Sequence, residues 1–234
     1  MSDNSLNRKV NLLIAYAIVM TGVCCFLLFF EKDGKQETID ELTVKRINIV
    51  DEEGDLRMVI SNEKRQHPGR LNGEELPKRE RPAGIIFFNS FGDECGGLIY
   101  DGNDQEAGLV LSVDKFKDDQ IMQLQYMENT EQKLRKYGLQ IWDYPKENTY
   151  TERNERFNKL KNSGTAEEQQ EAIQRMKLDS LLAEERLFIG KNFSKEVGLF
   201  INDRQGNPRI KIYIGDDNNP KIEFLDEKGN IITK

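Results

Sequence analysis

The stretch GLFINDRQGNPRIKIYI (Gly198–Ile214) places short apolar segments on both sides of a polar turn. Apolar residues alternate with other residues over Ile210–Ile214, which puts every second side chain on one side of a strand. At the turn, Asp203 can cap the backbone with its side chain and Gly206 can adopt a positive φ. The stretch therefore predicts a β-hairpin, and we expect the alternating residues to form a buried face.

The same turn pattern, Asp/Asn-x-x-Gly after a short apolar segment, recurs elsewhere in the chain at Asp51–Gly54, Asn89–Gly92 and Asp226–Gly229. Alternation also marks Leu56–Ile60 and Ile121–Met127, and together these signals indicate roughly ten strands. The spacing between turns is irregular. We therefore predict a mainly β fold, a meander or a sandwich of hairpin repeats, over residues 43–146 and 187–234.

Residues 147–186 interrupt this pattern with a predicted helical insertion. Thr165 and Glu168 have the spacing of a capping box, and strong helix formers follow them. An apolar stripe is formed by Ile173, Met176, Leu178, Leu181 and Leu182, and Phe157 and Leu160 indicate a shorter helix before Gly164. The simplest interpretation is a helical hairpin inserted into a β domain. A second interruption, Asn62–Pro82, is polar and rich in proline, which predicts a long loop.

The amino-terminal part of the chain holds an uncharged apolar run, Leu12–Phe30. A helix of this length spans about 28 Å, close to the thickness of a bilayer core. The run is longer than the apolar region of a signal peptide and lacks a small-residue cleavage site, and the residue before Cys24 is not the small one a lipoprotein needs. We predict a tail over residues 1–9, a retained transmembrane helix over residues 10–30 and a charged linker over residues 31–42.

Topology is predicted from the basic residues near this helix. Arg8 and Lys9 precede the helix, and a short basic tail of this kind favours the cytoplasmic side, although Lys32 and Lys35 follow closely. The large β region is then extracytoplasmic, and the protein crosses the membrane once. The short tail leaves no room for a signalling domain.

Composition narrows the function classes. Beyond residue 30 the chain holds 32 basic and 40 acidic residues, a net charge of −8, which argues against binding of nucleic-acid phosphates. The chain has one histidine, His67, and one cysteine outside the apolar run, Cys95. These cannot supply a recognisable zinc site. We therefore predict no catalytic, metal-binding or cofactor-binding residue.

Several residues of types that occur in functional sites have structural interpretations here. His67 is interpreted as a solvated loop histidine, Cys95 as a small buried or half-buried residue, and Trp142 as a core residue rather than a ligand platform. The acidic segments Asp101–Glu106 and Asp216–Pro220 are interpreted as turns, because the first lacks the glycine and glutamate positions of an EF-hand. The glycines Gly92, Gly96 and Gly97 lack the spacing of a nucleotide-binding loop. Two basic residues that follow turn glycines, Arg57 and Arg209, could bind an anionic ligand; we instead predict a structural role, in which each pairs with a turn carboxylate or covers a sheet edge.

Three segments carry a resemblance to known sequences: INIVDEEGDLRMVIS (Ile47–Ser61), GIIFFNSFGDECGGLIYDG (Gly84–Gly102) and Gly198–Ile214. With the apolar run, the chain resembles uncharacterised bacterial single-pass membrane proteins with an extracytoplasmic β-repeat domain. The resemblance implies an anchor and a β architecture, and no functional residue is implied by it. The helical insertion departs from that group.

The function predicted from these observations is that of a non-enzymatic envelope protein. Its membrane anchor displays a β domain that binds a protein partner or associates with itself, through the inserted helices or the loop Asn62–Pro82. One alternative is a glycan hydrolase that uses carboxylates such as Asp101, Asp104 or Asp143, which requires two carboxyl groups about 5–9.5 Å apart. Another alternative is a small-ligand binder with a pocket between the sheet and the helices.

Overall fold

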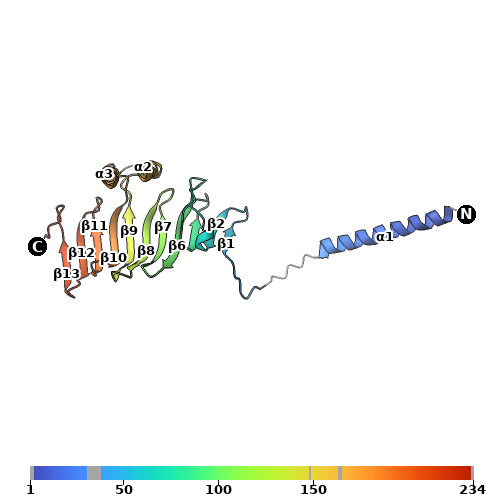
Figure 1. Cartoon of the computed structure of the whole chain (residues 1–234), viewed down its shortest axis with the longest axis horizontal. Helices are drawn as coiled ribbons and strands as arrows, with labels where there is room; N and C mark the ends of the chain where they lie inside the picture. Colours follow the sequence, from blue (N-terminus) through green and yellow to red (C-terminus); the bar gives the residue numbers. More distant parts are fainter. Residues whose placement is uncertain (1–2, 31–37, 148, 163–164, 233–234) are drawn as a thin grey trace. The chain divides into compact units, whose positions relative to one another are not determined.

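The computed structural model of the chain describes residues 3–30, 38–147, 149–162 and 165–232 (Figure 1). It divides into two compact units, residues 1–43 and residues 44–234. The strands and the later helices all belong to the second unit. The predicted mainly β fold, preceded by one apolar helix and containing a helical pair, is confirmed.

The first unit contains helix α1 (Asp3–Phe30). Its segment Leu6–Leu27 has a mean hydropathy of 2.2 and is long and apolar enough to cross a membrane. A signal sequence near an amino terminus meets the same criteria. The helix begins earlier than predicted, because residues of the expected tail continue the helical backbone from Asp3. Most of the predicted linker, residues 31–37, lies outside the described residues.

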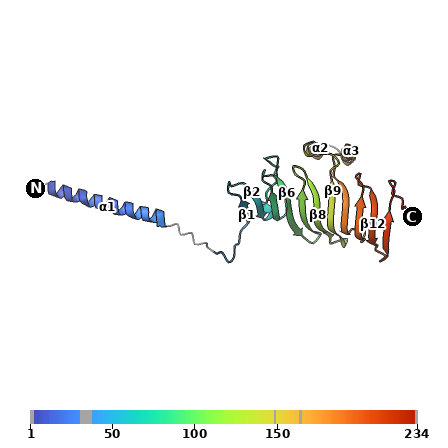
Figure 2. The ribbon, with the colours of Figure 1, turned by 180° about the vertical axis from the view of Figure 1, so that it is seen from behind.

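In the second unit, the described residues form one antiparallel sheet of eleven strands (Figures 1 and 2). The strands are β1 (Arg46–Val50), β2 (Leu56–Ser61), β5 (Gly84–Phe88), β6 (Glu94–Gly102), β7 (Glu106–Asp114), β8 (Gln120–Asn129), β9 (Leu134–Asp143), β10 (Glu184–Lys191), β11 (Val197–Asn202), β12 (Pro208–Ile214) and β13 (Pro220–Phe224). These eleven strands lie side by side in the order in which they occur in the sequence. Two further strands, which come between β2 and β5 in the sequence, form a small separate hairpin. Of the two predicted architectures, the meander is therefore the one observed.

The predicted turns adopt one common geometry, as the hairpin Gly198–Ile214 illustrates. The amide of Gly206 donates a hydrogen bond to the carbonyl of Asp203 (3.1 Å), and the side chain of Asp203 accepts one from the amide of Asn207 (2.9 Å). The φ of Gly206 is +79°, in the left-handed region that glycine adopts without strain. The turns that begin at Asp51, Asn89 and Asp226 repeat the bond from the glycine amide and the bond to the side chain of the first residue.

One turn of this kind was not predicted. Between β10 and β11, Lys195 takes the left-handed position with a φ of +63°. Its amide donates to the carbonyl of Asn192, and the side chain of Asn192 accepts a bond from the amide of Glu196. The sequence signal is absent because a lysine stands where the other turns have glycine.

Two insertions leave the meander, and both follow the predicted outline. The loop Asn62–Pro82 joins β2 to β5 and contains a short 3-10 helix (Glu63–Arg65) and the hairpin β3 (Arg70–Leu71) and β4 (Glu74–Glu75). The helical pair α2 (Tyr150–Asn162) and α3 (Ala166–Leu178) joins β9 to β10. It lies beyond the strand ends in both views of Figures 1 and 2. Strand β10 begins at Glu184, so the last residues of the predicted insertion belong to the sheet.

The capping box of α3 is present: the Thr165 hydroxyl accepts a bond from the Glu168 amide, and the Glu168 carboxylate accepts one from the Thr165 amide. The predicted first helix is not shorter than the second, because each has 13 residues. Gly164, before which this helix is predicted to lie, is outside the described residues. Within the predicted stripe, Met176 and Leu181 are buried, whereas Ile173 and Leu178 are exposed.

A buried ion pair fixes the helical pair to the sheet. The guanidinium of Arg153 on α2 donates to the carboxylate of Asp118 in the turn between β7 and β8, and both side chains are almost fully buried. The same guanidinium also donates to the carbonyl of Leu181 (3.3 Å) and lies 4.5 Å from the ring centroid of Tyr144. Removing one partner of such a pair leaves an uncompensated buried charge, so this contact restrains where the helices sit.

Candidate interaction surface

The strand register assigns almost every sheet residue to one of two faces. Residues directly opposite each other in neighbouring strands lie on the same face, and alternate residues of one strand lie on opposite faces. One side, which we call the apolar face, collects the residues Ile47, Ile49, Met58, Ile60, Ile85, Phe87, Leu98, Tyr100, Leu109, Leu111, Val113, Met122, Leu124, Tyr126, Tyr137, Leu139, Ile141, Leu187, Ile189, Val197, Leu199, Ile201, Ile210, Ile212, Ile214, Ile222 and Phe224. It runs from β1 to β13 without a break.

No residue of the apolar face is buried by the part of the chain that the structure describes. Leu124, on the central strand β8, is 51% exposed, and Ile222 on β13 is 66% exposed. A patch of this extent exceeds what soluble monomers usually expose and is typical of interaction sites. The alternation of apolar residues in several of these strands predicts a buried face, and this prediction is wrong for this side of the sheet within the described chain.

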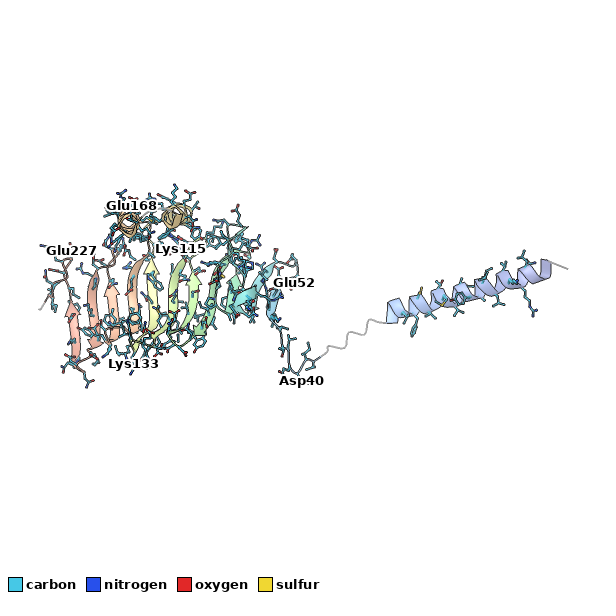
Figure 3. All side chains as sticks on the ribbon, viewed as in Figure 1. Asp40, Glu52, Lys115, Lys133, Glu168 and Glu227 are labelled. Carbon is cyan, nitrogen blue, oxygen red and sulfur yellow. The ribbon has the colours of Figure 1, made fainter. Side chains whose placement is uncertain are left out.

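Charged side chains are few among the residues that extend the apolar face. Glu128 and Arg135, near the strand ends, pair with each other at 2.8 Å, and Glu128 also accepts a bond from the Tyr126 hydroxyl. Lys191 continues the face at the end of β10. The labelled residues Lys115 and Lys133 mark the opposite rims of the sheet, where the turns lie (Figure 3). The centre of the apolar face therefore has few charged side chains whose desolvation would oppose burial.

The other side of the sheet, which we call the opposite face, carries the buried side chains. Near the amino-terminal strands, Val59, Ile86 and Phe88 form a core cluster. The loop Asn62–Pro82 supplies Leu71, which is buried. It also supplies His67, whose ring centroid lies 4.9 Å from that of Phe88. The prediction of a solvated His67 is wrong, since the loop folds over this cluster. Burial lowers the pKa of the His67 imidazole.

Near the carboxyl-terminal strands, the opposite face is covered by its own aromatic rings. Phe188, Phe200 and Tyr213 follow one another across β10, β11 and β12, with ring centroids 6.0 and 5.8 Å apart. Beside them, Gly138 and Gly190 face each other so closely that a Cβ on Gly138 would lie 2.1 Å from the carbonyl oxygen of Ile189. Only glycine fits this approach of the two backbones.

Between these two parts, the opposite face is polar and internally bonded. The Gln125 amide donates to the Gln140 side chain, which in turn donates to the carboxylate of Glu185. Lys136 donates to the same Gln140 oxygen at 2.8 Å. Gln125 and Gln140 are buried by these contacts. The polar side chains in this part of the opposite face thus bond to one another.

A small polar cavity of about 210 Å³ lies where the loop Asn62–Pro82, the β7–β8 turn and α2 meet. Arg81 and Glu94 pair across its wall at 2.6 Å, whereas Arg70 and Arg79 form no ion pair with the described residues. A buried carboxylate oxygen of Asp114 has no hydrogen-bond partner there. Burial raises the pKa of Asp114 to about 7, and the neighbouring Glu94 and Asp119 add to the shift. The cavity is smaller than most ligand pockets.

The two arginines singled out in the sequence pair as predicted. Arg57 donates to the carboxylate of Asp51 at 2.5 Å, and Arg209 lies 3.6 Å from the carboxylate of Asp203. Each arginine therefore joins the strand after a turn to the residue that opens the turn. Both predictions of a structural role are confirmed.

The carboxylates weighed for glycan hydrolysis are not assembled into one site. Asp101 and Asp104 lie at the end of β6 and in the turn that follows, whereas Asp143 ends β9 and lies 3.4 Å from Arg186. Because neighbouring strands are antiparallel, the ends of β6 and β9 lie on opposite rims of the sheet. At about 3.3 Å per residue, strands of this length hold Asp143 far beyond the separation required for a catalytic pair with the other two.

The remaining candidates have structural surroundings. Asp217 accepts a bond from the Asn219 amide in the β12–β13 turn, and Asn103 accepts bonds from two amides in the β6–β7 turn, so both acidic segments form the predicted turns. Cys95 is half-buried, as predicted. Trp142 is also half-buried, at the end of β9. In the described part of the chain, no cluster of three or more potential metal ligands occurs.

Comparison of the chain with protein-family models, with curated proteins and with solved structures finds no match. The resemblance to bacterial single-pass membrane proteins therefore stays a prediction. What the geometry defines is a class of architecture: a meander of one layer of strands, with one face packed by its own insertions and the other face apolar and open.

Proposed function

We propose that this chain is a non-enzymatic protein of the cell envelope, anchored by α1, whose extracytoplasmic sheet binds a protein partner through the apolar face. The observation that carries the proposal is the unbroken exposed apolar face from β1 to β13. Burial of apolar surface is the main favourable term in protein association. A tethered sheet with such a face is suited to bind and not to catalyse.

The apolar face is a better candidate for this contact than the two insertions named from the sequence. In the loop and the helical insertion, Leu71, Met176 and Leu181 are already buried within the chain, and the exposed Ile173 and Leu178 are fewer than the exposed residues of the apolar face. The insertions therefore have less apolar surface to offer a partner. We expect them to shape the rim of the sheet instead.

The contact is tested by placing a photo-crosslinking amino acid at single positions of the full chain in its native membrane. Leu124 lies on the apolar face, and Met127 lies three residues further on the same strand, on the opposite face. The two are similarly exposed, at 51% and 45%, so they form a matched pair. We expect protein adducts at position 124 and none at position 127. Equal labelling, or no protein adduct at 124, would contradict the proposed contact.

The predicted topology is tested separately. The side chain of Lys133 lies in the turn between β8 and β9, away from both faces. In a chain whose three cysteines are replaced by serine, Lys133→Cys should react with a membrane-impermeant maleimide in intact cells. Reaction only after lysis would place the sheet in the cytoplasm and overturn the extracytoplasmic assignment.

A further inference from the structure

We infer that the occupant of the apolar face is a second copy of this chain, whose sheet packs face to face against the first. This inference rests on the proposed function and names its partner.

The layer count comes first. Protein domains are built from at least two packed layers, because a sheet with an apolar face has to bury it against another element. Here the described part of the chain supplies only partial cover, and all of it on the opposite face or at the strand ends. For the apolar face, the missing layer has to come from outside the polypeptide. A second sheet of the same kind gives the aligned sandwich in which inner faces pack about 10 Å apart.

The area is sufficient for a stable dimer. With eleven described strands about 4.8 Å apart and a five-residue apolar segment rising about 3.3 Å per residue, the face measures roughly 48 by 17 Å. This is about 800 Å², the area that each partner contributes to a standard specific interface. A small ligand or a single helix would leave much of such a face in water.

The symmetry of the sheet favours an identical partner. The central strand in the sheet order is β8, with five described strands on either side. A two-fold axis that lies between the two sheets, parallel to β8 and level with its middle, would bring Leu124 near Leu124 of the second copy. It would also lay the amino-terminal strands of one copy on the carboxyl-terminal strands of the other. Such an interface is closed and uses the same patch twice, as in most homodimers.

Charge argues against a lipid surface as the occupant. The part of the chain beyond residue 30 has a net charge of −8, which anionic lipids repel. Between two copies, by contrast, the acidic residues stay at the rims, where salt screens them. Anchoring in one membrane also raises the effective concentration of the second copy.

The test uses two differently tagged full-length chains, co-expressed and kept in their native membranes, with Cys24, Cys25 and Cys95 replaced by serine. Each chain carries Leu124→Cys, and a short bismaleimide is added. We expect a cross-linked species that contains both tags. The control Met127→Cys should give at least fivefold less of it, because that residue points away from the second sheet.

A second pair of variants avoids dependence on cross-linker geometry. Leu124→Glu buries a charge in the sandwich but not in the isolated chain, so it should lower co-isolation of the two tags by at least tenfold, while Met127→Glu leaves it unchanged. Unchanged co-isolation with Leu124→Glu would overturn the inference, since association would then come from α1 or another surface. If position 124 forms photo-adducts only with a different protein, the inference of a second copy is overturned, but the proposed function is not. No protein adduct there would overturn both.

Discussion

The apolar face and the opposite face are made by alternate residues of the same strands, yet the chain treats them differently. The opposite face is covered by a folded loop near Ile86, by a row of aromatic rings and by hydrogen-bonded glutamine side chains. On the apolar face the chain places isoleucine, leucine, valine and tyrosine, and the described residues add no cover. The difference shows that period-two alternation identifies a face as apolar without saying which molecule covers it.

The largest loss of stability is expected at Gly138, where the opposite face has no space for a side chain. Gly138→Val adds a Cβ 2.1 Å from a backbone oxygen at a φ of +150°, so strands β9 and β10 would have to separate. We expect a loss of at least about 4 kcal/mol in the free energy of unfolding. The control is Gly108→Val, on the same face, where the nearest atom is 3.4 Å from the added Cβ. Denaturant unfolding measures both, and equal losses would contradict the close approach.

A smaller loss is expected when the core cluster is opened. Ile86→Ala removes a side chain that is 1% exposed and should cost about 2–5 kcal/mol. On the neighbouring strand, Ile60 belongs to the apolar face and is 39% exposed, so Ile60→Ala should cost no more than about 1 kcal/mol in the separated chain. Chemical denaturation at low protein concentration compares the two. Similar costs would mean that the two faces are buried alike.

The cavity beside the loop predicts a pH dependence. The pKa of Asp114 is raised from 3.8 to about 7, so its native state favours the protonated form. Its contribution to stability is present below pH 3.8 and is lost as the pH rises through about 7, on the order of 4 kcal/mol. Asp114→Asn should remove this dependence. The melting temperature is measured for both chains between pH 4 and pH 8, and parallel profiles would rule out the role of Asp114.

The smallest effect on folding is expected at the edge of the apolar face. Ile222 on β13 is 66% exposed, so Ile222→Ser should change the free energy of unfolding by no more than about 0.5 kcal/mol. It should nevertheless weaken association, because it removes apolar surface from the face. Unfolding of the separated chain and co-isolation of tagged copies give the two readouts. A large loss of stability with unchanged association would reverse the comparison of the faces.

Much of this fold follows from local chemistry that a sequence displays. The four glycine turns, the capping box at Thr165 and the pairing of Arg57 with Asp51 all depend on residues within a few positions of each other. The turn at Asn192 was not predicted, because Lys195 adopts the left-handed backbone conformation that glycine adopts in the other turns. Local signals also identified Leu12–Phe30, within α1, as long and apolar enough to span a membrane.

The parts that could not be predicted depend on contacts between distant residues. His67 is buried because its loop folds over Phe88, and nothing near His67 in the sequence indicates that contact. The buried pair of Arg153 and Asp118 joins positions 35 residues apart. Likewise, the alternation over Met122–Tyr126 is the same whether the chain, a partner or solvent meets that face.

The sequential order of the strands also bears on how the domain folds. Within the sheet, each strand pairs with the strand before it and the strand after it in the sequence. Only the loop between β2 and β5 and the helical pair between β9 and β10 separate paired strands by a long insertion. Contacts of short sequence separation allow fast folding, and a chain of nearest-neighbour units can start to fold at any hairpin and extend from it. Hairpins could be added or removed at either open edge without reorganising the rest. The sheet is in this respect a structure of adjustable length.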